Sequence, residues 1–179
     1  MKTALKLLIV SILLLGTTFA QNKMSATVNA GVSLPMGDFG STFSTGWGLD
    51  GTFLYGLQPN LDLTGTIGYH RWSAKETSDV TFSTVPVLVG VQYSFDNAGG
   101  FTPYAMAKIG LHFATVGASV LGMSVSTSEN DFGFLVGAGV LIPVGTNLNV
   151  DINASFNSIS TSGAASNYID VKAGVNFGL

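Results

Sequence analysis

The sequence predicts an all-β protein: an eight-stranded antiparallel up-and-down transmembrane β-barrel that follows an N-terminal signal peptide. Three observations predict this fold. Eight segments alternate between apolar and polar residues, the connections between them alternate between long and short, and only 9% of the 179 residues are charged, against about 25% in a typical soluble domain. The mean hydropathy is +0.44, yet after residue 20 no apolar run reaches the roughly 20 residues of a membrane-spanning helix.

The start of the chain has the pattern of a secretory signal peptide. Lys2 and Lys6 form a charged region, residues 7–15 are mostly apolar, and small residues precede the expected cleavage point. The apolar run is too short to cross a bilayer as a helix. We therefore expect a signal peptide over residues 1–20 and a single β-barrel domain over residues 21–179.

Composition narrows the possible partners and chemistry. Without the signal peptide, five basic residues face ten acidic ones, so the chain has no basic patch and nucleic acid is not an expected partner. The chain contains no cysteine, which excludes disulfides and thiol chemistry. We expect no cofactor.

Each predicted strand is read from a period of two. Residues 147–157, for example, read N-L-N-V-D-I-N-A-S-F-N, with Asn, Asp and Ser on one face and apolar residues on the other. Each segment has about the 9–11 residues that a tilted membrane strand needs. The eight predicted strands cover residues 26–34, 47–57, 61–72, 85–95, 102–113, 132–142, 147–157 and 168–179.

The connections between the predicted strands are alternately long and short. Tight turns at one end and longer loops at the other are typical of membrane barrels, where the tight turns are periplasmic and the long loops external. The long connections are residues 35–46, 73–84, 114–131 and 158–167, and the short ones are residues 58–60, 96–101 and 143–146.

The polar face is predicted to point into the barrel. An outward polar face would carry about 25–35% charged residues, whereas this one is mostly Gly, Asn, Thr and Ser, which suit the narrow interior of eight strands. The alternative is a soluble lipocalin-like barrel with the apolar face inside. Aromatic residues near the strand ends fit two interfacial girdles: Trp47, Tyr55, Tyr69, Tyr93, Phe95, Phe113, Phe132, Phe156 and Phe177.

Several charged residues fall on the inward face, where a charge must be paired. We expect a structural plug with Lys108 and Asp151 as partners near mid-height; the alternative is a narrow ion path. The predicted lumen network comprises Asp50, Asp62, Gln92, Lys108, Asp151, Asp170 and Lys172.

Two further sites can be considered from the residues. His70 and His112 could bind a metal together with Asp131 or Asp170, but their spacing is not that of metal ligands. His70 and Ser73, in the segment H-R-W-S, offer two members of a Ser–His–acid hydrolase. Nothing marks a nucleophile, so we expect neither a metal site nor an enzyme.

The chain resembles the outer membrane β-barrel proteins of the OmpA and OmpX type. The resemblance rests on P-M-G-D-F-G at 35–40, T-P-Y-A-M-A-K-I-G at 102–110 and F-G-F-L-V-G-A-G-V at 132–140. It covers the mature chain and implies a barrel-only, monomeric protein of the bacterial outer membrane, inserted by the barrel-assembly machinery. The chain ends in Leu179 where the family usually has Phe or Trp, but Phe177 has the expected parity.

The resemblance leaves the role open between structure and surface interaction, with a small lipid-modifying enzyme or narrow channel as alternatives. Residues 116–128 are apolar for an external loop, so the strand before them is expected to protrude and to offer an edge to an external partner. Alternatively, the protruding strands only shield one another. Arg71, with Lys75 nearby, is expected to meet anionic lipid or lipopolysaccharide, or to be an ordinary interfacial cation.

Overall fold

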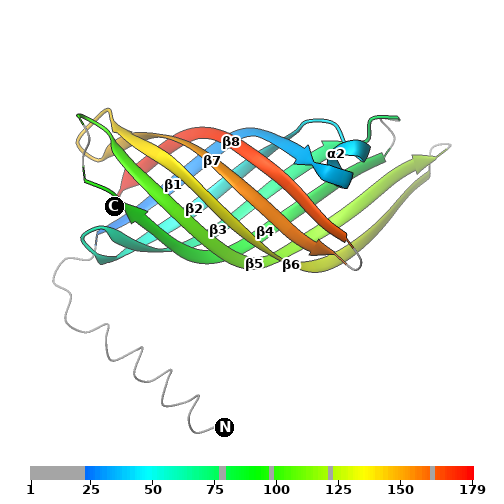
Figure 1. Cartoon of the computed structure of the whole chain (residues 1–179), viewed down its shortest axis with the longest axis horizontal. Coiled ribbons are helices and arrows are strands. Elements are labelled where there is room, and N and C mark those ends of the chain that lie inside the picture. The colour runs from blue at the N-terminus through cyan, green and yellow to red at the C-terminus, as the bar shows by residue number, and fades with distance from the viewer. Residues whose placement is uncertain (1–22, 77–79, 97–98, 121–122, 162–163) are drawn as a thin grey trace, which may run out of the picture.

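The structure is a closed barrel of eight antiparallel strands, in which every strand pairs with its neighbour in sequence and β8 pairs with β1 (Figure 1). The computed structural model describes residues 23–76, 80–96, 99–120, 123–161 and 164–179, so the expected signal peptide lies outside the described residues. The predicted fold class is confirmed. The elements are β1 (Met24–Met36), α2 (Gly37–Thr42), β2 (Gly46–Gln58), β3 (Leu61–Ser73), β4 (Val80–Ser94), β5 (Thr102–Val120), β6 (Met123–Pro143), β7 (Leu148–Thr161) and β8 (Ala164–Gly178).

The polar face lines the interior, as predicted. On β7 the side chain of Ile152 is 44% exposed on the outer wall, whereas that of Asn153, the next residue, is 6% exposed in the lumen. Each strand pairs with a neighbour on both sides, and the sheet closes on itself. This is the arrangement that a strand-built protein needs in lipid. In the described ranges, no helix is long and apolar enough to cross a membrane.

The strands extend beyond their predicted ends. We call the barrel end at which β1 begins and β8 ends the terminal end, and the opposite end the distal end (Figure 1). The predicted loop 114–131 is mostly a continuation of β5 and β6, which pair as far as Val120 and Met123. The period of two persists there with hydroxyls in place of apolar residues, and the hydroxyls of Thr115 and Ser128 lie 3.0 Å apart across the pair. The sequence analysis ended these two strands too early, because it took the polar residues as the start of a loop.

The long connection 35–46 contains the short helix α2. The chain turns into it at Gly37, whose φ of 59° favours glycine. The helix ends with the Phe43 N–H donating to the carbonyl of Phe39 (2.9 Å). It packs against β1 and β8, and its buried Phe39 ring lies 5.3 Å from the rings of Trp72 on β3 and Phe82 on β4. In Figure 1, α2 lies at the distal end.

Ile152→Arg tests which face meets lipid. We expect this substitution to lower the free energy of unfolding by about 2–4 kcal/mol, because it places a charge on the lipid-facing wall near mid-height. The measurement is urea unfolding of the protein refolded into lipid vesicles. Ser160→Arg, on the exposed distal part of the same strand, is the control and should change stability by about 1 kcal/mol or less. Equal losses for the two variants would contradict the assignment.

Candidate functional site in the barrel lumen

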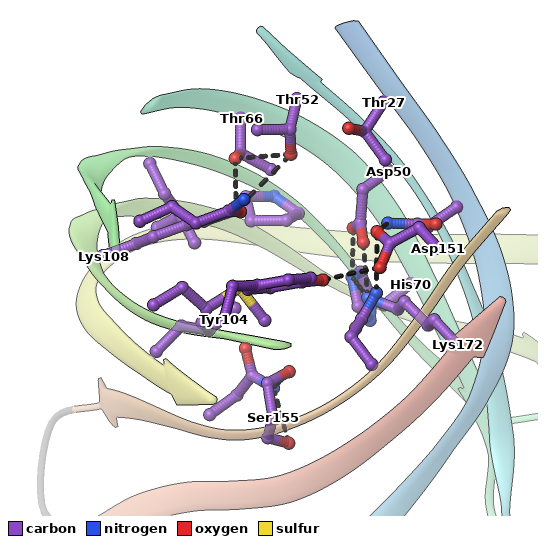
Figure 2. A pocket seen from close by; sticks show the side chains of 18 residues that line it. Thr27, Asp50, Thr52, Thr66, His70, Tyr104, Lys108, Asp151, Ser155 and Lys172 are labelled. Carbon is purple, nitrogen blue, oxygen red and sulfur yellow. Dashed lines mark hydrogen bonds and ion pairs between the residues drawn. The ribbon is translucent and has the colours of Figure 1, made fainter. Parts of the chain in front are cut away.

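Residues of β2, β3 and β8 form a charge cluster in the lumen (Figure 2). The Lys172 ammonium lies 2.7 Å from Asp50 Oδ2 and 2.8 Å from Asp170 Oδ2. His70 Nε2 lies 3.2 Å from Asp50 Oδ1, and the Ser33 hydroxyl donates to Asp170 Oδ1 (2.5 Å). One buried cation is thus shared by two carboxylates, and neutral groups complete their hydrogen bonding, as a buried ion pair requires.

A second group surrounds Asp151 on β7. Its carboxylate accepts hydrogen bonds from the Tyr104 hydroxyl (2.7 Å), the Asn29 amide (2.8 Å) and the Asn153 amide (3.3 Å). Figure 2 shows the Tyr104 ring lying across the lumen toward this carboxylate. Three neutral donors therefore hold the buried Asp151 carboxylate, which forms no ion pair within the described ranges.

Lys108 is placed differently from its predicted role. Its ammonium donates to the hydroxyls of Thr66 (2.9 Å) and Thr52 (3.4 Å), and Asp151 is satisfied by its own donors. The expected Lys108–Asp151 pair is therefore wrong. The physical reason is competition for partners, because the Tyr104 hydroxyl and the Asn29 and Asn153 amides already occupy Asp151, while Lys108 reaches the threonine hydroxyls of β2 and β3.

The remaining members of the predicted lumen network lie nearer the terminal end. Gln92 on β4 is buried and is the cross-strand neighbour of Asp62 on β3, which is half-buried. Neither side chain takes part in the hydrogen bonds of the two groups above among the described residues. The structure thus joins Asp50, Asp170 and Lys172 by ion pairs, whereas Gln92, Lys108 and Asp151 line the same cavity as Asp50 and Lys172 without joining those pairs, and Asp62 lies nearer the terminal end.

Large inward side chains lie over glycines of the adjacent strand. A Cβ on Gly31 would stand 2.9 Å from Lys172 Cγ, and one on Gly90 would stand 2.8 Å from Lys108 Cγ. The same holds at three more pairs, where an added Cβ would meet the neighbouring ring at 2.5–2.7 Å: Gly139 beside Tyr104, Gly48 beside His70 and Gly133 beside His112. These contacts are too short for a real Cβ, so the glycines provide the room that the large residues need.

An apolar cluster, which we call the cap, closes the distal end of the lumen. Trp72 and Tyr168 are almost fully buried, and their rings lie 4.9 Å apart. The Trp72 indole donates to the Ser33 carbonyl (3.1 Å), and its ring stacks on His70. The sequence analysis missed the cap, although its strand residues share the inward parity. Its members are Phe39, Trp72, Phe82, Ala114, Ile159 and Tyr168, with Phe43 packed against them.

The lumen is filled rather than open. Its polar cavity, which Asp50, Lys108, Asp151 and Lys172 help to line, has a volume of about 30 Å³, room for one or two waters. No group of three or more His, Asp or Glu side chains in the described part of the chain is arranged to hold a metal ion. The lumen therefore has the form of a plug.

The hydrolase arrangement considered from the sequence does not form. Ser73 points outward and is exposed, whereas His70 points into the lumen and is 2% exposed, because residues three apart on a strand face opposite sides. The serine beside His70 is Ser33, 3.2 Å from Nδ1. Its hydroxyl is fully buried and donates to Asp170, so a substrate could reach it only if the cap moved.

The predicted girdle residues lie on the outer wall. Three ring pairs stand out on this wall: Trp47 with Tyr69, Tyr93 with Phe95, and Phe134 with Phe156, at 5.5, 5.2 and 6.1 Å. Tyr55, Tyr93, Phe95 and Phe177 lie toward the terminal end, and Trp47, Tyr69, Phe113, Phe132 and Phe156 toward the distal end.

Gly31→Ala tests the packing of lysine over glycine. The new methyl group would collide with the β8 backbone and the Lys172 stem, so we expect a loss of about 1–3 kcal/mol in the free energy of unfolding. Gly65→Ala is the matched control, since nothing lies within 4 Å of its added Cβ, and its effect should stay within about 1 kcal/mol. Urea titration of both variants makes the comparison, and equal losses would rule out the steric explanation.

Lys172→Met tests the charge cluster. It leaves two buried carboxylates without their cation, so we expect a loss of about 3–5 kcal/mol in the free energy of unfolding. Lys108→Met removes an ammonium held only by hydroxyls and should be nearly neutral. The same urea titration measures both, and a larger loss for Lys108→Met would mean that the ion pairs of Lys172 are not what holds the lumen together.

Residues 8–179 match the family model of the outer membrane protein β-barrel domain. A search of the curated proteins found no match. Among solved structures, Neisserial surface protein A is 18% identical with a TM-score of 0.68, covering 87% of this chain and 97% of that one. Ail of Yersinia pestis is 18% identical with a TM-score of 0.58, covering 88% and 100%. The Escherichia coli outer membrane protease OmpT is 10% identical with a TM-score of 0.51, covering 92% and 100%.

These likenesses to solved structures show the fold alone, because an attachment protein and a protease share it. The family match covers the whole barrel, and the resemblance to outer membrane barrels inferred from the sequence motifs is confirmed. The chain therefore belongs to the outer membrane protein β-barrel domain family, as an eight-stranded barrel of the bacterial outer membrane.

Proposed function

We propose that the chain is a structural, surface-interacting barrel whose external β5–β6 hairpin binds an extended segment of a partner protein by strand addition. The observation that carries this proposal is an unpaired strand edge. In this family the short turns are periplasmic, so the distal end, with the hairpin and α2, is external.

The free edge belongs to β6 and follows from the strand pairing. β5 is flanked by β4 as far as Ala118. β6, in contrast, has a β7 neighbour only from Phe132, which pairs with Ser160. Among the described residues, residues 123–130 of β6 therefore have β5 on one side and no paired strand on the other. Such an edge is a template for an added strand.

The residues of this edge also support a binding role. Ser126, Thr127, Ser128, Glu129 and Asn130 are all exposed, and they include neither the lysines nor the prolines that commonly guard an edge. A hairpin that served only as a shield would gain nothing from an edge left open. Ail, whose name describes attachment and invasion, has the same fold, and this likeness agrees with the proposal.

The proposal assigns the lumen a supporting role, with neither catalysis nor conduction and no cofactor. The filled lumen and its charge cluster brace the wall from which the hairpin projects. The fully buried Ser33 hydroxyl, which donates to Asp170, supports the absence of a hydrolase. We also propose that a cleaved signal peptide exports the chain, that the barrel-assembly machinery inserts it, and that it acts as a monomer.

Proline substitutions on the edge test strand addition. Backbone N–H groups of successive residues point to opposite sides of a strand, so one of Thr127→Pro and Ser128→Pro removes a donor from the free edge. We expect beads coated with vesicles carrying that variant to lose at least about tenfold in attachment to cultured cells. Urea stability and heat-modifiability on gels should stay close to those of the wild type.

Glu129→Gln is the matched control, because it keeps the backbone and removes the charge. It should attach like the wild type. If both proline variants attach normally, or if Glu129→Gln alone abolishes attachment, strand addition at this edge is wrong.

A further inference from the structure

A row of outward-facing cross-strand neighbours climbs obliquely around the barrel from lipid to the external surface. It passes from Val32 through Trp47, Arg71, Ser83 and Thr115. The row climbs because barrel strands are tilted. Val32 and Trp47, on the lipid side, are apolar or aromatic, and Ser83 and Thr115, on the external side, carry hydroxyls. Arg71 therefore lies at the boundary between the apolar and the polar surface.

Further hydroxyls lie beside this row. Beyond Arg71 and Ser83, the next outward residues on the same strands are Ser73 and Thr81, which face one another across β3 and β4. On β1, where the row begins, the distal outward residues are instead the apolar Leu34 and Met36, 39% and 42% exposed. Above the lipid belt, the outer surface around Arg71 is therefore a polar patch, whereas that of β1 stays apolar.

Arg71 is the free cation of this patch. Lys108 and Lys172 are buried in the lumen, and the Lys75 ammonium donates to the carbonyl of Gly40. The Arg71 side chain is exposed, and no described residue forms a hydrogen bond or ion pair with its guanidinium. Within the described part of the chain, its five N–H donors are thus not used by protein groups.

The lipid side of the patch is suited to the interface. Trp47, the cross-strand neighbour of Arg71, is 53% exposed, and its ring lies 5.5 Å from that of Tyr69. Such amphipathic rings settle at the level of lipid headgroups. Below them the outward residues Leu49 and Ile67 are apolar and exposed. A lipid whose chains lie along this wall would therefore bring its headgroup to Arg71.

We propose that this surface, consisting of Arg71, Ser73, Thr81, Ser83 and Thr115 with Trp47 beneath, docks the phosphorylated sugar headgroup of a membrane glycolipid. The guanidinium binds the phosphate in a bidentate manner. The hydroxyls exchange hydrogen bonds with the sugar, which a choline headgroup cannot offer. The acyl chains pack on the apolar wall below.

The test uses the full mature chain refolded in detergent, with lipid A as the probe and phosphatidylcholine as the reference, and native mass spectrometry to measure bound lipid. We expect lipid A to bind the wild type at least about tenfold more tightly than phosphatidylcholine. Arg71→Gln should lose about tenfold in lipid A affinity, and Arg71→Lys, which keeps the charge without the fork, should lose less. Because Arg71 faces outward, these variants should fold normally.

Lys23→Gln is the matched control, since Lys23 is an exposed cation at the terminal end; it should bind like the wild type. Inorganic phosphate in excess should not displace the lipid. The proposal is overturned if Arg71→Gln binds lipid A as the wild type does, if Lys23→Gln loses as much, or if phosphate alone displaces the lipid. These outcomes are independent of attachment through β6, which the proline variants measure.

Discussion

The structure depends on one steric constraint: the interior of an eight-stranded barrel is narrow, and several of its large side chains fit only because the neighbouring strand carries a glycine beside them. Lys172 lies over Gly31, Lys108 over Gly90 and Tyr104 beside Gly139. Each pair joins adjacent strands, so the choice of glycine on one strand fixes which residue of the next can project inward. The glycines at these positions are in this sense as much a part of the lumen as the charged residues.

The electrostatics of the lumen follow from that packing. With little space for water, each charge must be satisfied by protein groups within reach. Lys172 serves two carboxylates, and Asp151 relies on neutral donors. The Lys172 ion pairs and the hydrogen bonds of Asp151 lie on different sides of the lumen. Lys108 joins neither group, because its ammonium is bound by the hydroxyls of Thr52 and Thr66. A network of this kind stiffens the wall, which suits a scaffold that carries an external hairpin.

Most of the fold could be predicted from the sequence, because a period of two is a local property. The inward parity of Asp50, Lys108 and Asp170 was predicted in this way. Their partners could not be, because pairing across the lumen depends on strand tilt and stagger, which parity does not contain; this is why the expected Lys108–Asp151 pair was wrong. Trp72 and Tyr168 share the inward parity. The sequence analysis missed them because it assigned apolar residues to the lipid-facing side of the barrel.

The cap also ties the end of folding to a visible event. Its residues come from α2 and from β3, β4, β5, β7 and β8, so it can assemble only when the last strand has closed the barrel against the first. The two tryptophans then have different surroundings, because Trp47 is 53% exposed on the outer wall at the headgroup level, whereas Trp72 is 1% exposed and becomes buried in the cap only on closure. The fluorescence of Trp47 therefore reports insertion into the membrane, and that of Trp72 reports closure of the barrel.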